Sequence, residues 1–120
     1  MPIDSAVIAR FLSAVHPYDA LSEASLATLI PKFETRLFFA EDEIYALGAA
    51  LDGLYLIHEG QVEIRDENDV PVSLLGPRNS FGERGLTRGG RAATSARAST
   101  ATVLLLLPRK DFALLMQAEP

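Results

Sequence analysis

The middle of this chain is a series of short apolar stretches, each followed by residues that favour turns. The stretches cover residues 37–39, 44–47, 54–57, 62–64, 72–75 and 103–107. Between them stand glycine, proline and acidic residues, at positions 41–43, 48, 52–53, 59–60, 66–69 and 76–77. Short apolar runs bounded by turns are typical of strands. Their regular spacing predicts an all-β sandwich, jelly roll or barrel.

Helical periodicity is found at the two ends of the chain. Apolar residues recur at helical spacing near the N-terminus, at Ile3, Val7, Ile8, Phe11, Leu12 and Val15. They predict a helix that is capped by Asp4 or Ser5 and ends near residues 16–17. A second helix is predicted from Ser22 to Phe33, and Pro31 should end or kink it. Residues 109–117 predict a last helix, and we expect the chain to be part of something longer.

Length and composition exclude several classes of protein. A chain of 120 residues forms one domain, and the absence of cysteine excludes a disulfide framework, a thiolate nucleophile and a Cys-based zinc site. The longest aliphatic run, residues 103–107, is too short to span a membrane, and the first residues lack a signal pattern. A pI near 4.9 argues against binding of nucleic acid by this segment. We expect a cytoplasmic location.

Residues 80–98 form a positive segment in an otherwise acidic chain. Between residues 78 and 97 there are five arginines and one acid, Glu83, while the whole chain has a net charge of -5. Such a positive island attracts an anion, and small residues let backbone N–H groups approach it. Residues 82–86 further predict the start of a short helix. We therefore expect a loop that binds a small anion such as a phosphate.

The sequence shows no catalytic or metal-binding pattern. His16 and His58 have no second ligand at metal-binding spacing, which favours a structural role. Residues 66–69 begin like a calcium loop, but Pro71 stands where that loop needs glycine. A nucleophile, a base and oxyanion donors are not found together. We predict neither enzymatic activity nor a cofactor or metal for this segment.

The order of these features resembles the cyclic nucleotide-binding domain family. Two helices precede a run of short strands, then Phe81-Gly82-Glu83 leads into an arginine-containing loop, a last apolar strand and a helix. Further marks of the family are Gly48, the stretch 54–64, Gly76 and Leu86. The resemblance covers nearly the whole chain.

The resemblance implies a mainly β fold with flanking helices. We expect a jelly-roll-like β-roll of about eight short strands, two N-terminal helices and one C-terminal helix. In this single domain, residues 1–34 hold the N-terminal helices and residues 35–108 the β-roll. A phosphate-binding cassette covers residues 80–98, and residues 109–120 start a truncated C-terminal helix.

The resemblance also implies which residues bind the ligand, either cAMP or cGMP. They are Phe81, Gly82, Glu83, Arg91, Ala92, Ala93 and Thr94. In the family the glutamate accepts a hydrogen bond from the ribose 2′-OH, a role that falls on Glu83. An arginine pairs with the cyclic phosphate, and this role falls on Arg91.

The spacing of the arginine departs from the family's usual pattern, in which it is the eleventh residue after the phenylalanine. Here the eleventh residue after Phe81 is Ala92, and Arg91 comes one position earlier. Either the turn at residues 87–90 is one residue shorter and Arg91 takes the arginine position, or that position is empty. The run Arg91-Ala92-Ala93-Thr94 favours the first alternative.

We therefore predict that Arg91, and neither Arg88 nor Arg97, pairs with the phosphate. Arg97 lies between two alanines, so it should point to solvent if they face inward. Arg84 is a further departure, because an aliphatic residue usually follows the glutamate in the family.

The function that follows is that of a regulatory module. It would bind a cyclic nucleotide, cAMP in preference to cGMP, and relay occupancy to a downstream effector domain. A homodimer is compatible with this function. One alternative is a non-binding structural or dimerisation version of the same fold. Another is the sensor half of a transcription factor or of a nucleotidyltransferase or CBS-type enzyme.

Overall fold

The computed structural model describes residues 4–13 and 22–112 of the chain. The helices in these ranges are α1 (Ser5–Leu12), α2 (Glu23–Leu29), the 3-10 helix η2 (Ile30–Lys32) and α3 (Glu83–Thr87). The strands are β1 (Glu34–Phe38), β2 (Glu43–Tyr45), β3 (Gly53–Glu59), β4 (Val62–Arg65), β5 (Pro71–Leu75), β6 (Ser80–Phe81), β7 (Ser95–Ala98) and β8 (Thr102–Pro108). Residues 109–112 are again helical, where the last helix was predicted to begin.

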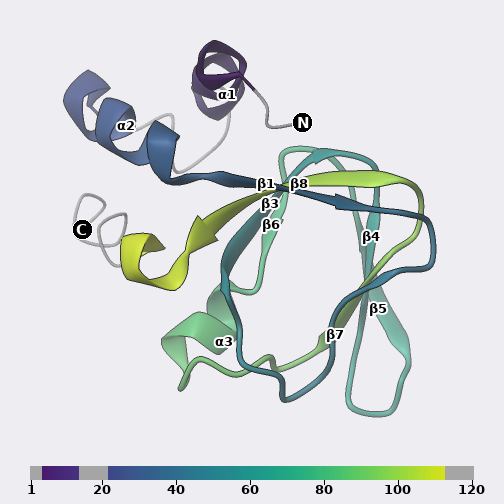
Figure 1. Cartoon of the computed structure of the whole chain (residues 1–120). Coiled ribbons are helices and arrows are strands. Elements are labelled where there is room, and N and C mark those ends of the chain that lie inside the picture. Colours follow the sequence, from purple (N-terminus) through teal and green to yellow (C-terminus); the bar gives the residue numbers. More distant parts are fainter. Residues whose placement is uncertain (1–3, 14–21, 113–120) are drawn as a thin grey trace.

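Within the described residues the strands form two four-stranded antiparallel sheets. The first has the order β1-β8-β3-β6 and the second the order β2-β7-β4-β5. The helices α1 and α2 lie against one side of this β-roll, and α3 lies at its edge between β6 and β7 (Figure 1). The predicted fold class, a mainly β roll with two N-terminal helices, is confirmed.

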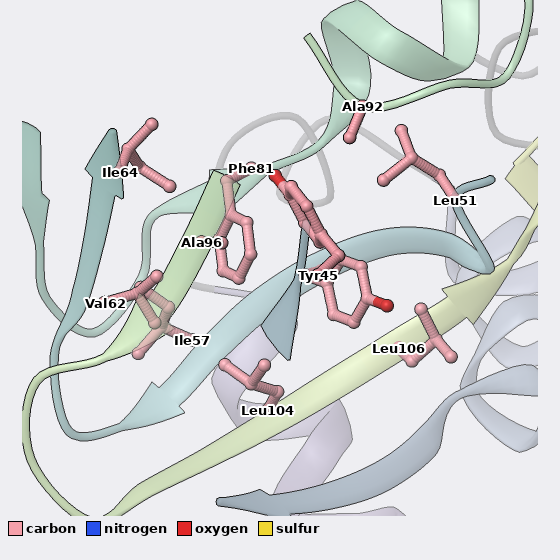
Figure 2. Packing of buried hydrophobic residues seen from close by; sticks show 11 residues of the cluster. Tyr45, Leu51, Ile57, Val62, Ile64, Phe81, Ala92, Ala96, Leu104 and Leu106 are labelled. Atoms are coloured by element: carbon pink, nitrogen blue, oxygen red, sulfur yellow. The ribbon is translucent and has the colours of Figure 1, made fainter. Parts of the chain in front are cut away.

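The central strands β3 and β8 are buried on both faces because their side chains alternate between two parts of the core. One part lies under α1 and α2 and includes Leu54, Leu56, Leu105 and Leu107. The other part lies between the two sheets and includes Tyr55, Ile57, Leu104 and Leu106. Figure 2 shows this second part, with residues of both sheets pointing toward one another.

The N-terminal helices begin where the sequence predicts. The Asp4 carboxylate accepts a hydrogen bond from the Ala6 N–H at 2.7 Å, and the Ser22 hydroxyl accepts one from the Ser25 N–H at 3.1 Å. The first helix ends earlier than predicted, at Leu12 with Ser13 as its C-cap. Val15, which was predicted to belong to it, lies outside the described residues.

Pro31 has the predicted effect on the second helix. The α-helix ends at Leu29, and Pro31 is placed in the 3-10 turn η2, because proline supplies no N–H for an α-helical hydrogen bond. The helix then leads directly into β1. No helix among residues 4–13 and 22–112 is long and apolar enough to cross a membrane.

Two strands, β6 and β7, were not predicted from the sequence. β6 consists of Ser80 and Phe81 alone, and β7 carries serine, alanine and arginine in place of a run of large apolar residues. β6 is a strand because it pairs with β3, and β7 is a strand because it pairs with β2 and β4. Each also brings one end of the segment 82–94 to the β-roll, and this segment holds the candidate site.

Candidate ligand-binding site

A cavity of about 320 Å³ lies between α3 and the segment 92–94 that precedes β7. Its size falls in the range of small-molecule sites. Six of the seven predicted site residues line it, namely Phe81, Gly82, Glu83, Ala92, Ala93 and Thr94. The two parts of the predicted cassette, separated by the turn at residues 88–90, therefore face the same space.

The first wall of the cavity is built by β6 and α3. Phe81 pairs with Tyr55 of β3, which fixes the start of the wall to the first sheet. Gly82 then turns the chain with a φ of 94°, a conformation that glycine adopts without a steric penalty. The predicted short helix follows as α3, and its first residue, Glu83, has an exposed side chain at the cavity.

The Glu83 carboxylate is available to a ligand. In the part of the chain that the structure describes, it takes part in no ion pair. An exposed carboxylate of this kind accepts hydrogen bonds from hydroxyl groups, and such charge-assisted bonds are stronger than neutral ones. The residue thus has the chemistry that the predicted contact with a ribose hydroxyl requires.

Aromatic side chains form the buried side of the first wall. Phe81 is stacked on Tyr55 with ring centroids 5.2 Å apart, and Tyr45 lies 6.0 Å from Phe81. Burial raises the pKa of Tyr45 to about 12, while a hydrogen bond with the Thr94 side chain acts in the opposite direction. Tyr45 therefore brings a neutral phenol to the cavity that it lines.

The second wall is held in place by backbone pairing with residues 48–51. The Ala92 N–H donates to the Ala49 carbonyl at 2.8 Å, and the Ala92 carbonyl accepts from the Gly48 N–H at 2.9 Å. The first wall approaches it closely at Gly85, where an added β-carbon would lie 2.5 Å from the Arg91 carbonyl oxygen. The absence of a side chain at Gly85 allows the two walls to meet.

Arg91 is the one predicted site residue that is not brought to the cavity. Its guanidinium donates to the Gly48 carbonyl at 3.1 Å, and its side chain is exposed. Ala92, the next residue, is 6 % exposed and lines the cavity. The Arg91 side chain is held by the Gly48 carbonyl and is not among the residues that line the cavity. Pairing of Arg91 with a phosphate stays a prediction.

Arg97 has the orientation that the alternation of residues 96–98 predicts. Ala96 and Ala98 are 1 % and 0 % exposed, and the Arg97 guanidinium lies 3.6 Å from the Glu41 carboxylate at the surface. Arg88 is exposed on the turn after α3 and does not line the cavity. Neither cation is directed at the predicted ligand.

Several residues of the cavity were not predicted. Tyr45, Leu51, Ile64 and Leu75 reach it from separate parts of the β-roll and form an apolar lining. Their contribution depends on how the strands are paired, which the local sequence pattern does not give. Arg84 also lines the cavity. The arginine stands where the family usually has an aliphatic residue, and this difference was the signal in the sequence that could have indicated its position.

Comparison with known proteins identifies the family. Residues 35–119 match the family described as "Cyclic nucleotide-binding domain", and the chain belongs to this family. The cyclic AMP receptor protein of Thermus thermophilus is 29 % identical over 107 residues, which cover 86 % of this chain and 50 % of that protein. A voltage-gated inwardly rectifying potassium channel of Rattus norvegicus is 35 % identical over 92 residues, or 75 % of this chain and 10 % of the channel.

Solved structures show the same fold. The regulatory domain of Toxoplasma gondii PKA, solved with cAMP, superposes with a TM-score of 0.87 at 22 % identity. The superposition covers 93 % of this chain and 45 % of that one. The chain spans half or less of the length of the curated relatives it matches, between 10 % and 50 %. The domain is thus found within larger proteins of different kinds.

Proposed function

We propose that the cavity between α3 and residues 92–94 binds a cyclic nucleotide, with cAMP preferred over cGMP. The observation that carries the proposal is the convergence of Phe81, Gly82 and Glu83 with Ala92 and Thr94 on one cavity in a member of the cyclic nucleotide-binding family. The preference for cAMP is supported by the names of two similar proteins, the cyclic AMP receptor protein and the cAMP-bound regulatory domain. In this proposal the segment binds a ligand and catalyses no reaction.

The Glu83 carboxylate would bind the ribose of the nucleotide. Its exposure and its lack of an ion pair among the described residues leave both oxygens free to accept hydrogen bonds. The apolar lining, including Leu51, Ile64 and Leu75, offers contact area to the flat base. Such a mixture of apolar walls with a few polar groups is typical of small-molecule sites.

Occupancy of the cavity would be relayed through the start of the C-terminal helix. The carbonyl of Gly90, just before the second wall, accepts from the Leu51 N–H at 2.9 Å, and the Arg109 N–H donates to the neighbouring Asp52 carbonyl at 3.0 Å. The Arg109 guanidinium lies directly over Gly90, where an added β-carbon would collide with it. A ligand that favours one arrangement of residues 88–94 would therefore shift the position of Arg109 and of any segment that follows it.

Isothermal titration calorimetry of this chain with cAMP and with cGMP tests the proposal. We expect saturable binding of one nucleotide per chain, with the lower dissociation constant for cAMP. The absence of heat and of any stabilisation against thermal unfolding at millimolar concentrations of both nucleotides would contradict binding. Tighter binding of cGMP would contradict only the preference.

A second candidate function is that of a structural or dimerisation domain without a ligand. It is favoured by the outward position of Arg91 and by large exposed apolar side chains on two edge strands. Leu37 of β1 is 62 % exposed, and Leu74 of β5 is 58 % exposed. Such edges attract partner chains. Sedimentation that shows a stable dimer, together with the lack of nucleotide binding, would support this candidate over the first.

A further inference from the structure

Tyr45 of β2 brings a buried hydroxyl group to the cavity. Its side chain is 8 % exposed. The other polar side chains that line the cavity within the described residues are exposed or half-buried, namely Ser80, Glu83, Arg84 and Thr94. A buried hydroxyl lowers stability unless it has a hydrogen-bond partner. The partner of the Tyr45 hydroxyl therefore indicates what this side chain does.

This partner belongs to the second wall of the cavity. β2 pairs with β7 so that Tyr45 lies opposite Ala96, and Thr94 comes two residues before Ala96. In an antiparallel pair, a diagonal neighbour of this kind is within reach of an aromatic side chain. The Thr94 side chain forms a hydrogen bond with Tyr45, and both residues line the cavity. Tyr45 thus links the second wall to β2.

The ring of Tyr45 contacts the first wall. Its centroid lies 6.0 Å from that of Phe81, with which the wall begins, and 5.7 Å from that of Tyr55. Figure 2 shows the Tyr45 ring beside Phe81. A β-carbon added at Gly82 would lie 4.0 Å from the Tyr45 oxygen, so the hydroxyl is also close to the turn that follows Phe81. One side chain therefore packs on the first wall and forms a hydrogen bond with the second.

The hydrogen bond is placed between two points at which the backbone already holds the second wall. Ala92 pairs with residues 48 and 49, and Ser95 begins β7. The link from Tyr45 to Thr94 adds a side-chain anchor between them. A wall that is held in place before binding loses less conformational freedom when a ligand arrives, and this preorganisation raises affinity.

We infer that Tyr45 is a positioning residue, which acts through Thr94 to fix the second wall against the first before the ligand binds. The inference rests on the proposed function, because it concerns the same cavity. It gives the Tyr45 hydroxyl a role in binding that requires no contact with the nucleotide.

A double-mutant cycle on this hydrogen bond tests the inference. Calorimetry with cAMP would be carried out on the wild-type chain, Tyr45→Phe, Thr94→Val and the variant with both changes. Each single variant removes one hydroxyl and should weaken binding about twofold to tenfold, as expected for one neutral hydrogen bond. The double variant should bind within about twofold of the weaker single variant, because the same hydrogen bond is lost only once.

Two controls accompany the cycle. Thr94→Ser keeps the hydroxyl and should bind cAMP within about twofold of the wild type. Thr28→Val removes a hydroxyl from α2, outside the cavity, and should leave the affinity unchanged.

Amide hydrogen exchange without ligand provides a readout that does not depend on the nucleotide. The Ala92 N–H, which donates to the Ala49 carbonyl, should exchange faster in Tyr45→Phe and Thr94→Val than in the wild type. In Thr94→Ser it should exchange at the wild-type rate. The amides of β8 should keep their rates in all of these variants, which shows that the scaffold is intact.

Three results would overturn the inference. If the wild type binds cAMP and Tyr45→Phe binds it equally well, the hydroxyl does not position the wall. If the losses of the two single variants add up in the double variant, Tyr45 does not act through Thr94. If the wild type binds neither cAMP nor cGMP, the proposed function fails and the inference fails with it.

Discussion

The pair of strands β3 and β8 differs sharply from the segment 82–94 that lies beside it. Residues 104–107 of β8 are at most 1 % exposed, and the two strands are covered on one face by α1 and α2 and on the other by the second sheet. In the segment 82–94, by contrast, the charged side chains at the cavity are exposed and most other residues are glycine, alanine or threonine. The strands can therefore contribute much to stability and little to binding. The segment can contribute much to binding and little to stability.

The difference indicates how the paired strands position the segment 82–94, which holds the candidate site. The segment begins at Phe81, which is fixed to β3, and it ends at β7, which is paired with β2 and β4. Backbone hydrogen bonds to residues 48–51 hold it at a third place. With three anchors, the polar side chains can stay exposed without the loop losing its conformation, as is common for binding loops on a rigid framework.

The largest expected effect belongs to the buried strands. Leu105→Ala should lower the free energy of unfolding by about 2–5 kcal/mol, because Leu105 is 0 % exposed and its removal leaves a cavity. Chemical denaturation measures this value. The matched control is Leu74→Ala on β5, where the side chain is 58 % exposed and a change within about 0.5 kcal/mol is expected. Equal effects in both variants would contradict the burial of Leu105 in the core.

The next effect is on binding and leaves the scaffold intact. Glu83→Gln should weaken binding of cAMP about tenfold to a hundredfold, since the ligand hydroxyl would bond to a neutral amide in place of a carboxylate. The thermal unfolding temperature without ligand should not change, because the Glu83 side chain is exposed. An unchanged dissociation constant in calorimetry would exclude Glu83 from the site.

At Gly85 the segment 82–94 is packed so closely that no side chain fits, as in the core between the strands. In Gly85→Ala the new β-carbon would approach both the Arg91 carbonyl oxygen and a methyl group of Leu51 to 2.5 Å. We expect a loss of about 1–3 kcal/mol in the free energy of unfolding, because overpacking forces the two walls apart. Gly76→Ala is the control, since no atom lies within 4 Å of its added β-carbon. Denaturation curves that coincide for both variants would show that the walls are not closely packed.

A smaller effect concerns the titration of tyrosine at the boundary between the two regions. Burial raises the pKa of Tyr45 to about 12, so the folded state favours the neutral phenol. The resulting stabilisation is complete below about pH 10, the ordinary pKa of tyrosine, and is lost as the pH rises through about 12. Ultraviolet titration should show a tyrosine step near pH 12 that is missing in Tyr45→Phe. A step near pH 10 for Tyr45 would contradict its burial.

Most of the fold could be predicted from the sequence. The apolar runs that became β3, β4, β5 and β8 are bounded by turn residues, and both caps and the break at Pro31 are local signals. The strands β6 and β7 could not be found in this way. β6 has only two residues, Ser80 and Phe81, and the side chains of β7 are small or polar. Pairing with distant strands determines the conformation of both strands.

The site was predictable where a local motif carries it. Phe81, Gly82 and Glu83 and the run at residues 92–94 were assigned from the resemblance to the family, and they line one cavity. Their contact with a ligand stays a prediction. The direction of the Arg91 side chain was not predictable, because it depends on the pairing of residues 90–92 with residues 48–51. The same reason applies to Tyr45 and Ile64, which reach the cavity from other strands.

The most direct test of the central claim is to locate the nucleotide by the changes in backbone amide NMR shifts when cAMP is added to the isotopically labelled chain. We predict saturable shifts that are largest at residues 80–85 and 92–94, on the two walls of the cavity. Val70 and Val72, which are exposed and do not line the cavity, should not shift. Saturable binding with its largest shifts at residues 70–73, or spectra that do not change at millimolar cAMP, would contradict the account.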